Sequence, residues 1–184
     1  MWQDLPSRRN LPIWPLLQKN RFHKEGTVNL IVTGIIAGIF GTVVMDVLNI
    51  LFARVGVITR IEVRGIGRMA VGWMHGRFSY RHPNQMQQVE NELCYGYLAH
   101  FAIGIGLAFP YLLGWHFLIG GPASPAWALV YGVGTTIVSY FYVYPCLGLG
   151  LFGRRSPDGI KAPLSSLANH LFYGIGLASV TAMV

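Results

Sequence analysis

The chain has 184 residues, of which 53% are hydrophobic and only 11% are charged, and its net charge is +7. A soluble domain usually carries about a quarter charged residues, so lipid must cover part of this chain. The basic residues flank apolar segments, which is typical of charge at a membrane surface, and we expect no nucleic-acid binding. Cys94 and Cys146 cannot form a disulfide framework and are expected to be free thiols.

Residues 1–27 form a basic, tryptophan-bearing extension before the first apolar segment. The stretch from Leu11 to Phe22 predicts a short interfacial helix anchored by Trp14. An unstructured tail, or a tail that docks on a larger partner, would fit the same composition. The bases that would face lipid headgroups are Arg8, Arg9, Lys19, Arg21 and Lys24.

Four apolar segments are long enough to cross a hydrocarbon core of about 30 Å. They are residues 28–53, 92–114, 125–147 and 162–184. The sequence therefore predicts an all-α integral membrane domain over 28–184, with four transmembrane helices and both termini on one side. Small residues spaced for close helix packing occur within three of the segments, at Gly34, Gly38, Gly104 and Gly174.

The connection between the first two segments is the longest in the chain. Arg60, Arg64 and Arg68 recur every four residues, and Trp73 falls on a different face. This pattern predicts a basic amphipathic helix that lies in the membrane interface, with Gly76 at its end.

The chain contains an internal repeat. Residues 100–108 and 170–178 both begin with histidine and share the sequence Gly-Ile-Gly-Leu-Ala. In the segments before them, residues 41–46 align with residues 134–139, which places Asp46 opposite Ser139. The repeat predicts two tandem helical hairpins related by a pseudo-two-fold axis along the membrane normal.

The repeat also predicts a layer of polar side chains inside the membrane. Asp46, His100, Ser139 and His170 each lie roughly 10–12 Å from the same membrane surface, and Asn49 shares a face with Asp46. The layer is interpreted either as hydrogen-bonding glue between helices or as a proton or ion relay. A haem or divalent metal at His100 and His170 and recognition of a lipid or quinone are further alternatives, and bound lipid is expected.

The distribution of basic residues predicts the orientation. By the positive-inside rule, the side with more basic residues is cytoplasmic, so both termini are expected in the periplasm. That side holds nine bases: Arg54, Arg60, Arg64, Arg68, Arg77, Arg81, Arg154, Arg155 and Lys161.

The chain resembles the bacterial domain-of-unknown-function family 2938 over roughly residues 30–184. The resemblance lies in Asp46, residues 72–78, His100, and the stretch from Pro145 through residues 154–157 to residues 170–174. It implies a small four-span bacterial membrane protein and nothing further about function. The basic N-terminal extension departs from the short N-terminus expected of that family.

No hydrolytic or phosphoryl-transfer motif occurs in the sequence. The function expected first is therefore a non-catalytic accessory or scaffold subunit of a larger complex in the bacterial inner membrane, contacting lipids and other membrane subunits through the N-terminal extension and the helix surfaces. A small proton- or ion-coupled transporter that uses Asp46, His100 and His170 is the second hypothesis. A haem-binding electron-transfer subunit is the third.

Overall fold

The computed structural model describes residues 14–120 and 123–183, with side chains from Asn29 onward. Within these residues the chain forms helices joined by turns and extended segments, and it contains no strand. The elements in chain order are α1 (Trp14–Arg54), α2 (Val63–Met74), η1 (Pro83–Gln85), α3 (Glu92–Gly114), η2 (Trp115–Ile119), α4 (Pro125–Gly134), α5 (Thr136–Val138), η3 (Ser139–Val143), α6 (Tyr144–Cys146), η4 (Leu151–Gly153) and α7 (Lys161–Thr181).

Three helical runs within the described residues are long and apolar enough to cross a membrane: Asn29–Arg54, Glu92–Ile119 and Pro125–Cys146. They coincide with three of the four predicted segments. The fourth predicted segment is largely covered by α7, which is a single helix of 21 residues. Many large apolar side chains of the three runs are exposed, as expected for helices that face lipid.

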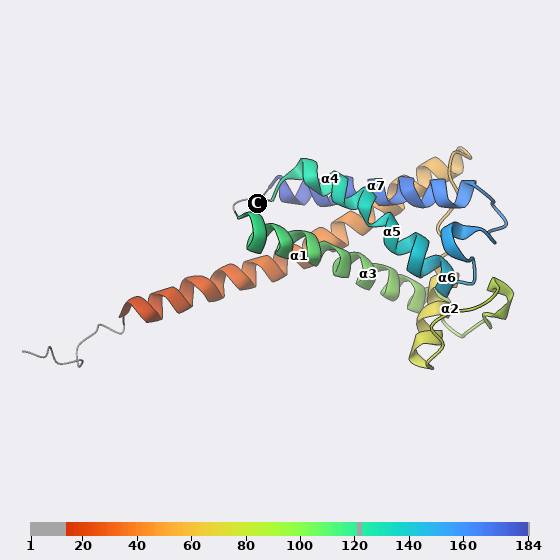
Figure 1. The fold of residues 1–184 in the computed structure, drawn as a ribbon, viewed down its shortest axis with the longest axis horizontal. Coiled ribbons are helices and arrows are strands. Elements are labelled where there is room, and N and C mark those ends of the chain that lie inside the picture. Colours follow the sequence, from red (N-terminus) through yellow and green to blue (C-terminus); the bar gives the residue numbers. More distant parts are fainter. Residues whose placement is uncertain (1–13, 121–122, 184) are drawn as a thin grey trace, which may run out of the picture.

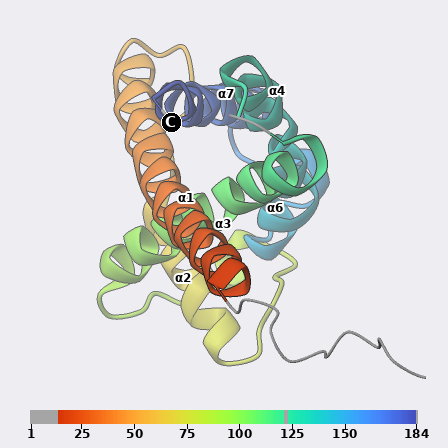
Figure 2. The ribbon, with the colours of Figure 1, turned by 90° about the vertical axis from the view of Figure 1, so that its left-hand side faces the viewer.

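The helices pack as a bundle in which α1 contacts both α3 and α7, and α7 also contacts α4. Figure 1 shows α4 and α7 running side by side, with α2 at the end of the bundle where α3 begins. The connections from α1 to α2 and from α6 to α7 lie at that same end, while the first part of α1 projects beyond the opposite end. Figure 2 shows the bundle from the side on which α1 projects.

The helix α1 is continuous from Trp14 to Arg54, so no break separates residues 14–22 from the first apolar segment. The predicted interfacial helix is therefore part of a longer helix over those residues. Residues 11–13, and the side chain of the predicted anchor Trp14, lie outside the part of the chain that the structure describes.

Close contacts between helices occur at the predicted packing glycines. A Cβ atom built on Gly38 would lie 2.4 Å from the Cα of Ile105, so α1 and α3 touch through their backbones. Gly104 faces the Thr42 hydroxyl at the same contact, and Gly34 faces the ring of Phe109. Because glycine has no side chain, the two helix axes can approach closely and gain contact along their length.

The helix α7 is held on both sides in the same way. A Cβ atom built on Gly132 of α4 would lie 2.4 Å from the Cα of Gly174, the remaining predicted packing glycine. One built on Gly176 would lie 2.6 Å from the Cα of Gly41 in α1. The Gly-Ile-Gly sequence of the second repeat therefore places α7 between α1 and α4.

The third apolar run is irregular, because it changes helical register twice. The α-helical pattern ends at Gly134 and resumes at Thr136, and residues 139–143 form a π-helix in which the Tyr144 N–H bonds to the Ser139 carbonyl. Pro145 has no N–H to donate one turn back, which favours a local departure from the α-helical pattern. The π-helix begins at Ser139, one of the predicted polar residues.

The predicted amphipathic helix in the first connection corresponds to α2, but the helix starts later than the arginine spacing suggests. It begins at Val63, so the prediction that Arg60 belongs to it is wrong, and Arg60 lies in the extended segment before it. The Arg68 guanidinium donates to the Glu92 carboxylate at 2.7 Å and 3.2 Å, and this hydrogen bond raises the pKa of Arg68. Arg64 is 3.8 Å from the same carboxylate, and Trp73 packs against Tyr142.

The helix α2 is thus fixed against the start of α3. A Cβ atom on Gly67 would lie 1.9 Å from the Glu92 carbonyl oxygen, and one on Gly96 would lie 2.2 Å from the Val63 carbonyl oxygen. These backbone contacts require glycine at both positions, and the buried face of α2 combines glycines with the fully buried side chain of Met69.

The α4–α7 contact can be tested with two glycines that lie two residues apart. We expect Gly132→Ala to destabilise the protein by about 1–3 kcal/mol, because the added methyl group must push the α7 backbone away. Gly134→Ala is the matched control, since no atom lies within 4 Å of its Cβ position and alanine favours a helix. Thermal unfolding in detergent measures both, and equal midpoints for the two variants would contradict the contact.

Candidate functional site

Each of the two repeat histidines forms a hydrogen bond with a side chain of another helix. The Nε2 atom of His100 on α3 is 2.9 Å from the Oδ1 atom of Asp46 on α1. The Nε2 atom of His170 on α7 is 2.8 Å from the hydroxyl of Ser139, where the π-helix begins. The structure therefore brings the four residues together as two pairs, one at each aligned position of the repeat.

A second hydroxyl bonds to the other nitrogen of His170. The Thr135 hydroxyl is 2.8 Å from Nδ1 of His170, and it also donates to the Gly132 carbonyl at 2.6 Å. A hydroxyl has one proton, so Thr135 must accept the hydrogen bond from the Nδ1–H of His170. In the neutral imidazole Nε2 is then the acceptor, and the Ser139 hydroxyl donates to it. This tautomer is assigned from the hydrogen bonds.

The same reasoning gives His100 the opposite tautomer. An ionised carboxylate can only accept hydrogen bonds, so the Nε2 atom that faces Asp46 carries the proton. Nδ1 of the neutral His100 is then the basic nitrogen. The carboxylate fixes the orientation of the ring through this hydrogen bond. The two histidines therefore differ chemically although they occupy equivalent positions in the repeat.

Asn49, the fifth predicted polar residue, has a separate role. Its amide nitrogen donates to the Thr59 carbonyl at 3.0 Å and to the Oδ1 atom of Asn169 at 2.9 Å. Its Oδ1 atom accepts from the Ile61 N–H at 3.2 Å. The side chain is 2% exposed, and two of its three hydrogen bonds hold the segment before α2, while the third joins it to α7.

The extended segment around Thr59 enters the bundle and is satisfied there by side chains. The Thr59 N–H donates to the Ser165 hydroxyl at 2.8 Å, and that hydroxyl donates to the Lys161 carbonyl at 2.6 Å. Backbone that is neither helix nor sheet is tolerated at membrane depth only where protein or a water-filled cavity satisfies it. Asn49 and Ser165 provide those partners here.

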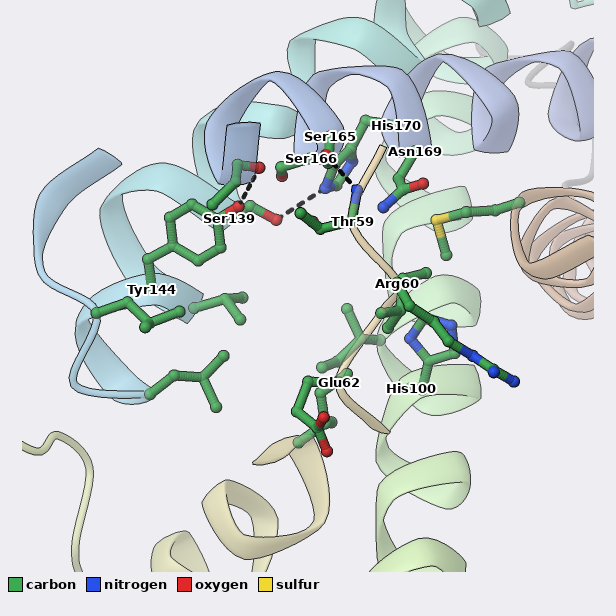
Figure 3. Close-up of a pocket in the computed structure, with 18 of the residues that line it drawn as sticks. Thr59, Arg60, Glu62, His100, Ser139, Tyr144, Ser165, Ser166, Asn169 and His170 are labelled. Atoms are coloured by element: carbon green, nitrogen blue, oxygen red, sulfur yellow. Dashed lines mark hydrogen bonds between the residues drawn. The ribbon is translucent and has the colours of Figure 1, made fainter. Parts of the chain in front are cut away.

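A cavity of about 220 Å³ lies inside the bundle next to this segment. Figure 3 shows His100 on one side of it, Ser139 and Tyr144 on the other, and four residues of α7 above. Its apolar lining includes Met69, Ile103 and Leu107. The polar and charged residues that line it are Thr59, Arg60, Glu62, His100, Ser139, Tyr144, Ser156, Asp158, Ser165, Ser166, Asn169, His170 and Tyr173.

Three of the five predicted polar residues line the cavity. His100, Ser139 and His170 line it, whereas Asp46 does not and contacts His100 instead. The polar residues of this region that sequence reasoning missed include Thr59, Thr135, Ser165, Ser166 and Asn169. Ser165 and Asn169 are four residues apart, and Ser166 and His170 share the same face of α7, so the helical periodicity used for the first segment could have found them.

The geometry does not favour a metal or haem site. No group of three or more histidine, cysteine, aspartate or glutamate side chains suited to a metal ion occurs in the described part of the chain. In addition, hydroxyls occupy both nitrogens of His170, so neither is free to act as a ligand in this arrangement. Both cysteines are free thiols, Cys94 exposed and Cys146 buried.

Several membrane-length helices around a polar interior define this chain as a multi-pass helical membrane protein. Within that class, it belongs to the family described as "Protein of unknown function (DUF2938)", which matches residues 35–184. This confirms the resemblance found in the sequence. No curated protein and no solved structure matches the chain.

The role of Asn49 predicts a local effect of its removal. We expect Asn49→Leu to cost about 2 kcal/mol or more, because buried backbone groups around Thr59 and Ile61 lose their partners. Hydrogen exchange of the peptide 57–62 should become faster, whereas Val47→Ala on the exposed face of α1 should leave that rate unchanged. Unchanged exchange in Asn49→Leu would show that other groups hold the segment.

Proposed function

We propose that α7 is a fourth transmembrane helix. Its polar residues Ser165, Ser166 and Asn169 are buried in the bundle, so they lower its hydropathy without facing lipid. Its exposed side is apolar and follows a helical period through Leu164, Leu167, Leu171 and Ile175. A helix that is polar inward and apolar outward suits a membrane more than a membrane surface.

The proposed four spans form two hairpins related by a pseudo-two-fold axis. Similar contacts in both halves support this. Thr42 donates to the Gly38 carbonyl and Thr135 donates to the Gly132 carbonyl, in each case beside the closest contact with the partner helix. Gly104 lies at this contact in one half, facing Thr42, and Gly174 lies at it in the other half, facing Gly132; each follows its repeat histidine by four residues.

We place the chain in the bacterial inner membrane with both termini in the periplasm. The two long connections, which contain the nine bases, lie at the end of the bundle where α2 lies. The element η2 lies at the opposite end, and the sequence of residues 115–124 contains no lysine or arginine. The positive-inside rule then makes the α2 end cytoplasmic.

Single cysteines test the number of spans. In a chain with Cys94 and Cys146 replaced, we expect Ile160→Cys and Met183→Cys to react with a membrane-impermeant maleimide from opposite faces, because α7 crosses the membrane between them. Leu118→Cys serves as the reference and should react from the same face as Met183→Cys. Labelling of both ends of α7 from one face would place this helix on the surface. Spheroplasts and inverted vesicles give access to the two faces.

We propose that the protein is a small membrane carrier that binds a polar solute in the cavity together with a proton. The observation that supports this most is the cavity itself, where both repeat histidines meet hydroxyl and amide side chains inside an otherwise apolar bundle. Polar interiors are costly in membranes, and those that persist usually mark pathways for solutes or protons. A helical scaffold would need no such space.

The proposed proton site is the pair formed by His100 and Asp46. The bare nitrogen of neutral His100 can take a proton, and the Asp46 carboxylate then neutralises the imidazolium through the Nε2–H. Because His100 lines the cavity, its charge changes the surroundings of any bound solute, which couples the two binding events. The other pair, His170 with Ser139, has no carboxylate and serves the solute.

Transport can be measured in proteoliposomes with labelled solutes of neutral, anionic and cationic charge. We expect saturable uptake of one class, driven by an inward proton gradient. Asp46→Asn should reduce this uptake about tenfold or more, because the amide can still accept from His100 but cannot stabilise its charge. The control is Glu90→Gln, the corresponding acid-to-amide change at an exposed position outside the cavity, and both variants should unfold at the wild-type temperature.

An accessory subunit is the second candidate, favoured by one feature of the fold. The first fifteen residues of α1 precede the apolar run and project from the bundle, where they are free to meet another membrane subunit. Absence of any solute uptake, together with extraction in a larger assembly under mild detergent, would favour this role over the carrier. A monomer that takes up solute would exclude it.

A further inference from the structure

The deep part of the cavity has no charged side chain of its own. The charged lining residues Arg60, Glu62 and Asp158 are exposed and belong to the two connections at the α2 end. The carboxylate of Asp46 is bonded to His100 and does not line the cavity. The deeper polar groups are hydroxyls, a carboxamide and imidazoles, from Ser139, Ser166, Asn169, His100 and His170.

One of these groups is a hydrogen-bond donor that has no partner among the described residues. Asn169 is 8% exposed, and its Oδ1 atom accepts from Asn49. Its amide nitrogen donates no hydrogen bond to the described residues. The nitrogen is also not completely enclosed by protein atoms, so it remains accessible. The NH₂ group therefore faces the cavity that its residue lines, and it needs an acceptor on whatever occupies that space.

Acceptors and a further hydroxyl lie around this donor. The Ser139 hydroxyl gives its proton to His170 in the neutral tautomer, so its oxygen remains as an acceptor toward the cavity. Ser166 is 8% exposed, lies four residues before His170 on the same face of α7, and can both donate and accept. A bound molecule must therefore offer donors and acceptors close together, which is the chemistry of hydroxyl groups.

We infer that the cavity binds a small neutral solute with several hydroxyl groups, about the size of one sugar ring. Its volume of about 220 Å³ is below the roughly 300–1,000 Å³ of sites for drug-sized ligands. Met69, Ile103 and Leu107 supply apolar walls for the C–H faces of such a ring. An ionic group would lose its hydration without meeting an uncompensated opposite charge, because Asp46 neutralises a protonated His100. The inference rests on the proposed use of the cavity as a solute site.

Three probes with one ring and different charges test the inference: glucose, glucuronate and glucosamine. Binding to the full-length protein in detergent is measured by ligand-observed NMR, which requires no transport. We expect glucose to bind about tenfold or more tightly than either charged probe. Tighter binding of a charged probe, or no binding of glucose, overturns the inferred solute class.

Two variants link binding to the deep polar groups. Ser166→Ala should weaken glucose binding about tenfold, whereas Ser179→Ala, whose hydroxyl is exposed on the same helix, should leave it unchanged. Asn169→Asp keeps the acceptor for Asn49 but replaces the free donor by a negative charge. It should therefore weaken glucose binding and strengthen glucosamine binding. Glucose binding that is insensitive to both changes would place the sugar elsewhere.

The outcomes separate this inference from the carrier proposal. Glucose binding without uptake would support the solute class and contradict transport. Uptake of a charged solute alone, without glucose binding, would support the carrier and overturn the solute class.

Discussion

The need to satisfy polar groups inside an apolar bundle determines most of this structure. An unpartnered donor or acceptor costs more in such surroundings than in a soluble protein, because no water is at hand. Asn49 meets this need most fully, since both its amide protons and its oxygen are used, two of them for the segment before α2. That segment can therefore enter the bundle as extended chain and form one wall of the cavity. Without these bonds neither the wall nor the space would persist.

Backbone contacts at glycines position the helices so that these hydrogen bonds can form. The backbones of α1 and α3 touch at Gly38, and those of α4 and α7 touch at Gly132, so their side-chain groups are brought within bonding distance. In each half a threonine bonds back to the glycine at the contact, and in the second half that threonine also meets the histidine. Close packing and the histidine pairs are thus parts of one arrangement, which explains why the Gly-Ile-Gly sequence follows each histidine in the chain.

The sequence predicts the parts of the site that depend on local periodicity. The depth of Asp46, His100, Ser139 and His170 follows from counting residues along helices, and these four residues do form pairs between helices. Asn49 could not be assigned in this way, because its partner segment becomes adjacent only when the bundle is folded. The arginine spacing predicts that Arg60 belongs to the helix, but α2 and its close contact with α3 begin only at Val63.

The two halves of the repeat differ in the side chain that pairs with the histidine, and the proposed function depends on this difference. An exact repeat would give both histidines the same partner, but the first half has a carboxylate where the second has a hydroxyl. A carboxylate stabilises a charged imidazole, whereas two hydroxyls suit a neutral one and leave oxygen lone pairs for another molecule. The proposed division into a proton site and a solute site therefore arises from one difference, Asp46 against Ser139. Exchanging these two side chains would reverse that asymmetry while leaving the glycine contacts in place.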